Sequence, residues 1–269
     1  MKHLIVGCGC VGKATATFLE AQKEDVYYYD ANKVTLDFLT REGKKTWYVL
    51  CPKTHFEVYW ICTPETEVEN VLKMIPKSEL HSRLIVVRST TVPGTLDALE
   101  KKYKIENLAH NPEFLREKTA TEDTFFPDRI IIGSNESFAS GCLLRLYNHL
   151  TCPSVCVNLR TSELIKQISN AYLATQISFW NEVKSICDAF DTNPQMIANA
   201  VTLDKRISKY GTIMLGSPFS GKCLPKDLNN LLEVMKKKRI PSYVLHSVRN
   251  LNDWIASRRR DEGKHGNKI

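Results

Sequence analysis

Long apolar runs are missing from this sequence, and no stretch approaches the roughly 20 residues that a membrane-spanning helix requires. Internal repeats and low-complexity blocks are missing as well. Metal-site spacing is also missing, because Cys8 and Cys10, like Cys152 and Cys156, are too close together and have too few Cys or His residues nearby. We therefore expect neither a membrane partner nor a bound metal.

What is present is the composition of an ordinary globular protein, with 269 residues of which 43% are apolar and 25% charged. This is enough for one large domain or two modest ones. The nine cysteines are an odd number, so we expect free thiols in a reducing cytoplasm, most of them small core residues. The net charge of +7 fits an anionic ligand such as a nucleotide or phosphorylated sugar, or simply a basic surface. The run KKKR at 236–239 suits a solvated helix end better than a nuclear signal, and no nucleic-acid partner is expected.

The N-terminal stretch MKHLIVGCGCVGKATA imitates a secretory signal peptide, with a basic start, apolar residues and an A-x-A. Its apolar part is short and carries three glycines, which favours a buried strand at 4–6, a turn and then a helix. Strands continue to alternate with helices to about residue 155, which predicts an α/β domain with a mostly parallel sheet. The further strands are expected within 25–30, 56–64, 82–95, 106–117 and 128–134, with helices at 32–43 and 66–75.

The hydrophobic pattern changes after residue 155: residues 161–190 keep a helical period and contain no Pro or Gly. Further helices are expected at 193–201, 227–239 and 241–260, and the tail is polar. We therefore predict a Rossmann-like dinucleotide-binding domain at 1–155, an all-helical central domain at 156–258 and a polar tail at 259–269.

A dinucleotide motif lies at the N-terminus, where Gly7, Gly9 and Gly12 form G-x-G-x-x-G between strand and helix. The first glycine permits the tight turn, the second lets a pyrophosphate approach the backbone, and the third lets the helix pack closely. Asp30 ends the second strand 18 positions after Gly12. A carboxylate there binds the ribose hydroxyls and repels a 2′-phosphate, so NAD is favoured over NADP, although a chance glycine turn is the alternative.

A thiol with cationic neighbours lies in GSPFSGKCLPKDLN, residues 216–229, where Cys223 precedes a predicted helix. Lysines and a helix N-terminus both favour the thiolate, while a buried apolar cysteine is the alternative. On the long helix, Glu163, Lys166 and Asn170 share one face, which taken alone also fits a solvated surface. Elsewhere, loops beside predicted strand ends offer three further polar residues, Thr90 in RSTTVPGT and Glu113 and Glu117 in NPEFLRE.

Together these motifs resemble the UDP-glucose/GDP-mannose dehydrogenase family. The motifs are GCGCVG, YYYDANKV, ICTP, RSTTVPGT, NPEFLRE, SELIKQISNAYLATQISFWNE, DKRI and CLPKD, in the family's order over roughly residues 1–255. The resemblance implies oxidation of a nucleotide-sugar C6 alcohol to a carboxylate with two NAD⁺. Cys223 matches the family's nucleophile, which forms a thiohemiacetal and then a thioester that water hydrolyses.

The resemblance also implies roles for the other residues. Lys166 matches the lysine that stabilises oxyanionic character, Asn170 matches its helical partner, and Glu117 matches the hydrolysis glutamate. Asp227 and Thr90 match the residues that hold the catalytic water. The expected substrate residues are Glu113, Arg206, Phe219 and Gly221. The expected cofactor residues are Gly7, Gly9, Cys10, Val11, Gly12, Asp30, Lys33, Thr63, Pro64, Ser89, Thr90 and Glu117.

Arg206 matches an arginine that reaches the partner subunit's substrate, so the resemblance implies a homodimer. Two departures from the family qualify this assignment. Ser220 and Lys222 stand where the family has glycine and a small hydroxyl residue. Family members also continue into a second Rossmann-like domain of about 100 residues, which holds the nucleotide half of the substrate. Here a separate polypeptide supplies that domain, the substrate is bound weakly, or it is not a nucleotide sugar.

Two other functions stay open from the residues themselves. One is a two-electron dehydrogenase of a small hydroxyacid, with Lys166 as the general base. The other is a non-catalytic NAD-binding module that forms dimers. The number of NADH molecules released per substrate, and the effect of thiol alkylation, distinguish the three.

Overall fold

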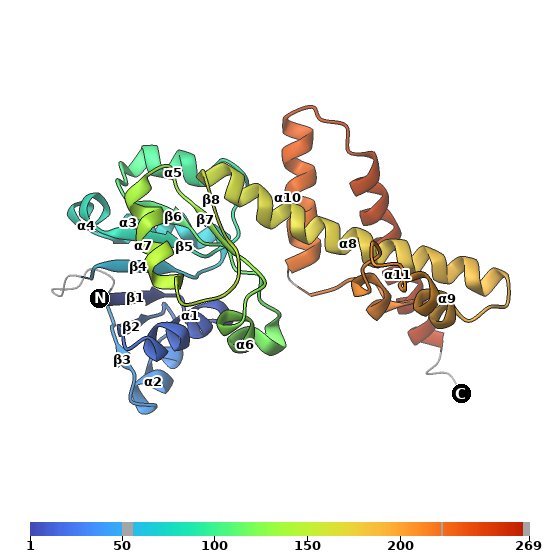
Figure 1. Ribbon diagram of the computed structural model, residues 1–269, viewed down its shortest axis with the longest axis horizontal. Coiled ribbons are helices and arrows are strands. Elements are labelled where there is room, and N and C mark those ends of the chain that lie inside the picture. Colours follow the sequence, from blue (N-terminus) through green and yellow to red (C-terminus); the bar gives the residue numbers. More distant parts are fainter. Residues whose placement is uncertain (50–55, 222, 266–269) are drawn as a thin grey trace. The chain divides into compact units, whose positions relative to one another are not determined.

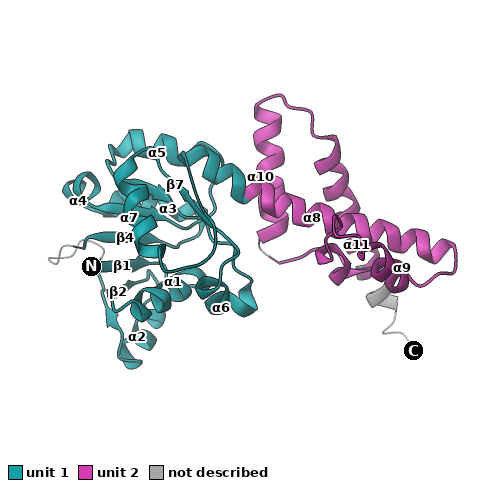
Figure 2. Ribbon diagram, viewed as in Figure 1, with its two compact units in different colours: residues 1–166 teal, residues 167–269 magenta. Residues whose placement is uncertain are grey.

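The computed structural model describes residues 1–49, 56–221 and 223–265, with side chains to residue 259. These residues form two compact units, residues 1–166 and residues 167–269 (Figure 2). Lys222 lies outside the described residues. The predicted domain boundaries at 155/156 and 258/259 stay predictions. No helix among the described residues is long and apolar enough to cross a membrane.

The first unit contains one sheet in the order β3-β2-β1-β4-β5-β6-β7-β8 (Figure 1). Neighbouring strands are parallel except β6 and β7, which are antiparallel. The chain order reverses between β1 and β4, and this is the switch point at which open α/β sheets bind ligands. The strands are β1 (Lys2–Val6), β2 (Asp25–Tyr29), β3 (Lys45–Thr46), β4 (Val58–Ile61), β5 (Leu84–Val87), β6 (Leu108–His110), β7 (Ile130–Gly133) and β8 (Ser154–Val157).

Both faces of this sheet are covered by helices, because alternate residues of a strand point to opposite faces. Leu4 and Tyr59 pack in a core with α3, α4 and α5, while Ile5 and Trp60 pack in a second core with α1, α2 and α7. Strands buried on both faces explain the continuous apolar runs in the sequence. The helices are α1 (Cys10–Ala21), α2 (Lys33–Arg41), α3 (Val68–Met74), α4 (Lys77–Ser82), α5 (Thr95–Tyr103), α6 (Ala120–Phe125) and α7 (Ser137–Tyr147), with short 3-10 turns η1 (Glu65–Glu67) and η2 (Glu117–Thr119).

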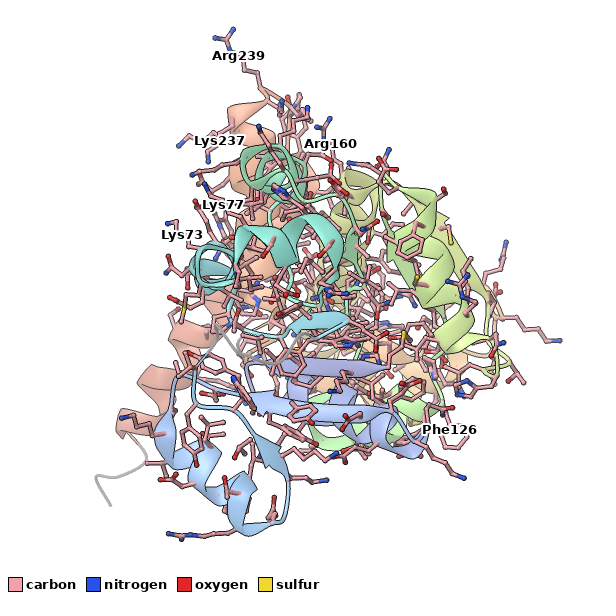
Figure 3. All side chains as sticks on the ribbon, turned by 90° about the vertical axis from the view of Figure 1, so that its left-hand side faces the viewer. Lys73, Lys77, Phe126, Arg160, Lys237 and Arg239 are labelled. Carbon is pink, nitrogen blue, oxygen red and sulfur yellow. The ribbon has the colours of Figure 1, made fainter. Side chains whose placement is uncertain are left out.

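The surface of the first unit carries dispersed positive charge. Lys73, Lys77 and Arg160 point outward from three different helices (Figure 3). Phe126, directly after α6, is 81% exposed and also points outward (Figure 3). The basic composition is therefore, at least in part, a property of the outer surface.

The second unit is helical in its described residues, which confirms the predicted fold class. Its elements are the main part of α8 (Leu159–Ala189), α9 (Pro194–Val201), the 3-10 turn η3 (Tyr210–Met214), α10 (Cys223–Lys237) and α11 (Tyr243–His265). Asn193 caps α9 by accepting hydrogen bonds from two backbone N–H groups, as its Asn-Pro start predicts. A core of Ala174, Ile177, Phe219, Leu228 and neighbouring residues joins α8, α10 and α11.

Two predictions need correction. The helix expected from 227 begins at Cys223, because Pro225 is tolerated in a first turn, where its missing N–H leaves no bond unmade. Most cysteines were expected in the core, but of the eight described only Cys8 and Cys187 are buried. All eight are free thiols.

Candidate active site

The glycine turn after β1 has the geometry that a dinucleotide requires. Gly7 has a φ of +93°, which a side chain would strain, and its added Cβ would meet Thr63 Cγ2 at 2.9 Å. An added Cβ on Gly12 would lie 1.9 Å from the Gly7 carbonyl oxygen. Gly9 is the N-cap of α1, uses no side-chain cap and has open space around its missing Cβ. The first N–H groups of α1 therefore face a space that phosphate groups fit.

Asp30 is fixed at the carboxyl end of β2 beside this turn. Its Oδ2 accepts a hydrogen bond from Cys8 N at 2.8 Å, and its Oδ1 accepts one from Asn32 N at 2.8 Å. Each carboxylate oxygen keeps a second lone pair for a ribose hydroxyl. Lys33 is exposed at the first position of α2, which Asn32 caps. These residues fit the adenosine half of NAD.

The loops after β4 and β5 are joined at the same edge of the sheet. Ser89 Oγ donates a hydrogen bond to the Thr63 carbonyl oxygen at 2.6 Å, and Ser89 is 8% exposed. Pro64 follows as the N-cap of η1, and Thr90 follows Ser89 in a half-buried position. The Thr63 hydroxyl, also buried, accepts or donates no hydrogen bond within the described chain. The cofactor residues predicted on β1, β2, β4 and β5 thus gather at the carboxyl ends of neighbouring strands.

Behind these loops, His110 ties β6 to β5 and to α8. Its Nδ1 lies 2.9 Å from Ser162 Oγ, and its Nε2 lies 3.2 Å from the Ser89 carbonyl oxygen. Complete burial lowers the pKa of His110 to about 3, with the positive charges of Lys166 and Arg88 acting in the same direction. The imidazole is therefore neutral. Apart from its position before Asn111, no local pattern in the sequence indicates this role.

Lys166 is buried at 4% exposure and engages the NPEFLRE turn. Its Nζ donates to the Glu113 carbonyl oxygen at 2.6 Å and lies 3.2 Å from Glu113 Oε1. The same ammonium lies 5.1 Å from the centre of the Phe114 ring, over which the Arg129 guanidinium also lies at 4.1 Å. Phe114 was not singled out in the sequence, because an aromatic residue in a loop usually indicates packing alone.

Glu117 begins η2 and is exposed, and its backbone lies beside the glycine turn. The Cys10 thiol donates to the Glu117 carbonyl oxygen at 3.9 Å, so the turn after β6 approaches the start of α1. Val11, the next residue of α1, is half-buried. The first unit therefore brings Glu117 and the glycine turn together, as the resemblance requires.

Glu163 has a structural task that the sequence did not reveal. It is fully buried, and its Oε1 accepts from Thr91 Oγ1 at 2.8 Å and from Leu96 N at 3.0 Å. Its Oε2 accepts from Gly94 N at 2.5 Å, so the carboxylate caps the N-terminus of α5. Burial raises the pKa of Glu163, and these three hydrogen bonds act against that rise. The interpretation of Glu163, Lys166 and Asn170 as a solvated face is therefore wrong.

In the second unit, Asn170 and Asp227 form a buried pair beside the start of α10. Asn170 Nδ2 donates to Asp227 Oδ2 at 2.5 Å, and the two residues are 6% and 1% exposed. Lys226 Nζ lies 2.7 Å from Asp227 Oδ1, which neutralises the buried carboxylate. Cys223, the first residue of α10, is exposed. A thiol at a helix N-terminus with a lysine in the first turn is in a setting that favours the thiolate.

The remaining predicted substrate residues have different settings. Phe219 is 3% exposed with its ring in the helical core, so we keep a substrate contact only for its backbone. Gly221 is exposed with a φ of +82°. Arg206 is exposed after α9 and pairs with Asp204, with Nε–Oδ1 at 3.0 Å and Nη2–Oδ2 at 2.6 Å. This pair uses Nε and Nη2, so the Nη1 donors of the guanidinium are not engaged by Asp204.

No group of three His, Cys, Asp or Glu side chains in the described part of the chain is arranged to hold a metal.

Sequence reasoning also missed a buried polar cluster behind β5 and β6. Arg88 Nη1 donates to Asn111 Oδ1 at 2.6 Å and to the Tyr147 hydroxyl at 3.1 Å. The position of Arg88 and Asn111 directly after two buried strands is the signal that could have indicated it.

Two sequence profiles of one protein family match this chain. Residues 63–151 match the sequence profile of the NAD binding domain of the UDP-glucose/GDP-mannose dehydrogenase family. Residues 160–254 match the profile of that family's central domain. Both halves of the chain therefore match successive domains of one family.

Individual relatives point the same way. A UDP-glucose 6-dehydrogenase from Rickettsia bellii is 38% identical over 196 residues, which are 68% of this chain and 44% of that protein. The UDP-glucose 6-dehydrogenase YwqF from Bacillus subtilis is 33% identical over 70% of this chain and 44% of its own length. The chain thus spans less than half the length of these curated relatives.

Among solved structures, a UDP-glucose dehydrogenase from Pyrobaculum islandicum superimposes with a TM-score of 0.84 at 25% identity. The superposition covers 94% of this chain and 68% of that one. Two adjoining domain profiles, curated relatives and a solved structure agree with the family that the sequence motifs indicate. The chain belongs to the UDP-glucose/GDP-mannose dehydrogenase family and carries its NAD-binding fold.

Proposed function

We propose that this protein oxidises the C6 alcohol of a nucleotide sugar to a carboxylate in two NAD-dependent steps. One observation carries the proposal. Lys166 and Asn170, four residues apart on α8, are both buried, and each is hydrogen-bonded to another residue to which the resemblance gives a role in the site. A surface helix would expose polar residues at this spacing. Their burial instead suits groups held for chemistry.

Bound NAD⁺ would accept the two hydrides, one from the alcohol and one from the adduct described below. Gly7, Gly9 and Gly12 leave room for its pyrophosphate at the N-terminus of α1. Asp30 holds the ribose hydroxyls, and because its carboxylate is already anchored by two backbone N–H groups, it binds them without reorganising. A 2′-phosphate would be repelled by the same charge.

The aldehyde produced by the first oxidation needs a tetrahedral adduct before it can lose a second hydride. In our proposal the Cys223 sulfur attacks the aldehyde carbon, and the resulting alkoxide takes a proton to give a thiohemiacetal. Loss of a hydride and of the hydroxyl proton would leave a thioester, and water would then attack the carbonyl carbon and displace the sulfur, which releases the carboxylate and regenerates the thiol. The balance is one alcohol, one water and two NAD⁺ to one carboxylate, two NADH and three protons.

The buried polar groups stabilise the charges of these steps. Lys166 offers a cation for the developing oxyanion, and its ammonium is already desolvated and oriented by Glu113 and Phe114. Asn170 and Lys226 hold the Asp227 carboxylate. For hydrolysis of the thioester we keep the roles that the resemblance implies, in which Asp227 and Thr90 would orient the water and Glu117 would assist its attack. Glu113, Arg206, Gly221 and the Phe219 backbone would bind the sugar.

The experiment is NADH release measured by absorbance with UDP- and GDP-sugars, small alcohols and hydroxyacids. We expect two NADH per nucleotide sugar and only trace turnover in Cys223→Ser, while Cys156→Ser, at another exposed cysteine, behaves like the wild type. Equal turnover in Cys223→Ser would remove the thiol from the mechanism. One NADH per hydroxyacid with no effect of alkylation would select the two-electron dehydrogenase. NAD binding without turnover on the whole panel would select the interaction module.

We also propose that the protein is a homodimer through α8. Large apolar side chains on this helix recur at helical spacing and stay exposed, namely Ile168 at 53%, Tyr172 at 62%, Phe179 at 57% and Ile186 at 54%, and Phe190 at 75% follows directly after the helix. A stripe of this kind indicates an interface. Light scattering should give a dimer for the wild type and a monomer for Phe179→Asp. A monomeric wild type would overturn this part.

Addition of a separately expressed nucleotide-binding domain from a relative would test whether a second polypeptide completes the substrate site.

A further inference from the structure

The loop that leads to Cys223 is held from two sides by buried amides. Asn181 on α8 donates from Nδ2 to the Ser217 carbonyl oxygen at 2.7 Å. Asn252 on α11 donates from Nδ2 to the Phe219 carbonyl oxygen at 3.2 Å. The two helices therefore grip carbonyl groups two residues apart in the same loop.

Each of these amides is only half satisfied. Asn181 is 3% exposed and Asn252 is 8% exposed, and the Oδ1 of each accepts no hydrogen bond within the described chain. A buried polar atom without a partner lowers the stability of the folded protein. An asparagine whose Oδ1 is buried without a partner does not improve the packing of the helices. We therefore attribute the presence of asparagine at positions 181 and 252 to the hydrogen bond that each Nδ2 donates to the loop.

The backbone of the loop has no regular secondary structure, and Ser217 N donates a hydrogen bond to the Met214 carbonyl oxygen at 2.9 Å. Residues 217–220 form neither helix nor strand, and they lie between Gly216 at φ +73° and Gly221 at φ +82°. The Phe219 ring is buried in the helical core, which draws the neighbouring carbonyl groups into apolar surroundings. The two amide donors thus satisfy carbonyl groups that would otherwise favour a loop conformation closer to water.

We propose that Asn181 and Asn252 are positioning residues that fix residues 217–219 and, through them, the Cys223 thiol at the start of α10. The catalytic consequence rests on the proposed function, because attack on an aldehyde carbon requires the sulfur within a narrow range of positions. A displacement of about 1 Å at a reacting group can cost about a hundredfold in rate. The glycines at either end therefore mark the limits of a fixed loop.

The test uses the full chain with Asn181→Leu and Asn252→Leu, which keep the size of the side chain and remove its donor. Asn181→Ala and Asn252→Ala provide second variants if leucine does not fold. Ser178→Ala is the matched control, because Ser178 is buried on the same helix and donates to the Val248 carbonyl oxygen on α11 instead of to a loop carbonyl group. Each variant is studied by hydrogen exchange of peptides covering 216–221 and by the alkylation rate of Cys223 relative to Cys156.

Loss of one hydrogen bond, at about 0.5–1.5 kcal/mol, should speed exchange of the loop roughly two- to tenfold, while α8 and α11 exchange as in the control. The alkylation rate of Cys223 should change relative to Cys156, and kcat should fall more than KM changes. Unchanged loop exchange in folded variants would overturn the proposal. Equal acceleration throughout residues 167–265 would also overturn it, because the amides would then be ordinary packing residues. If the loop exchanges as predicted but the wild type has no dehydrogenase activity, the positioning role of Asn181 and Asn252 is supported and the proposed function is contradicted.

Discussion

The buried His110 gives the sharpest prediction about stability. In the native protein its pKa is lowered to about 3, whereas the unfolded chain has the ordinary value of 6.5. The unfolded state therefore binds a proton between these two values while the native state does not. This contribution to stability is fully present above pH 6.5 and is lost as the pH falls towards 3.

The magnitude follows from the size of the pH step. One pH unit in this window is worth about 1.36 kcal/mol, so acidification from pH 7 to pH 5 should cost the wild type about 2 kcal/mol through His110 alone. His110→Gln cannot acquire this charge, so its unfolding free energy should fall by about 2 kcal/mol less over the same interval. Other titrating groups are common to both proteins and cancel in the comparison.

Urea unfolding followed by tryptophan fluorescence provides the measurement. Trp180→Phe and Trp254→Phe in both proteins would leave Trp47 and Trp60 to report on the first unit alone. A histidine elsewhere in that unit, such as His81, gives a control when changed to Gln. Parallel curves of free energy against pH for the wild type and His110→Gln would refute the reasoning.

Three further predictions concern the cofactor loops. Gly12→Ala should abolish NAD binding and lower stability, measured by thermal denaturation, by about 1–3 kcal/mol, because the added Cβ would overlap the Gly7 carbonyl group. Gly9→Ala has open space around the added Cβ and should keep the wild-type melting temperature. Asp30→Ala should lower the affinity for NAD, measured by calorimetry, and reduce the ratio of NAD affinity to NADP affinity. An unchanged ratio of the two affinities would contradict the assignment of Asp30 to the ribose hydroxyls. Glu163→Ala should destabilise the first unit by about 1–3 kcal/mol in urea, since it leaves three capped donors without their acceptor.

Much of the first unit could be predicted because its signals are local. A short apolar strand, three glycines and an acidic strand end define a dinucleotide site within 30 residues, and the structure places Gly7, Gly12 and Asp30 together. The helices α4 to α7 were missed, since they are short and depend on packing against the sheet for their stability. The start of α10 was misplaced because a proline was taken as a boundary, although a first turn accepts it.

Side-chain burial was the least predictable property. Glu163, Lys166 and Asn170 have the spacing of a solvated face, yet all three are buried. Their partners, Gly94, Glu113 and Asp227, lie more than 50 residues away in the chain. No local pattern contains that information.

The sequence by itself determined the α/β character of the first unit and the helical character of the second, the glycine turn with its acidic partner and the set of motifs that indicate the family. These depend on periodicity and on backbone geometry that only glycine tolerates, and both are properties of neighbouring residues. The tertiary structure alone decided that Asn181 and Asn252 grip the loop before Cys223, and that His110 is kept neutral. Desolvation and hydrogen bonding between distant segments arise only when the chain has folded, so these features have no counterpart in the linear pattern.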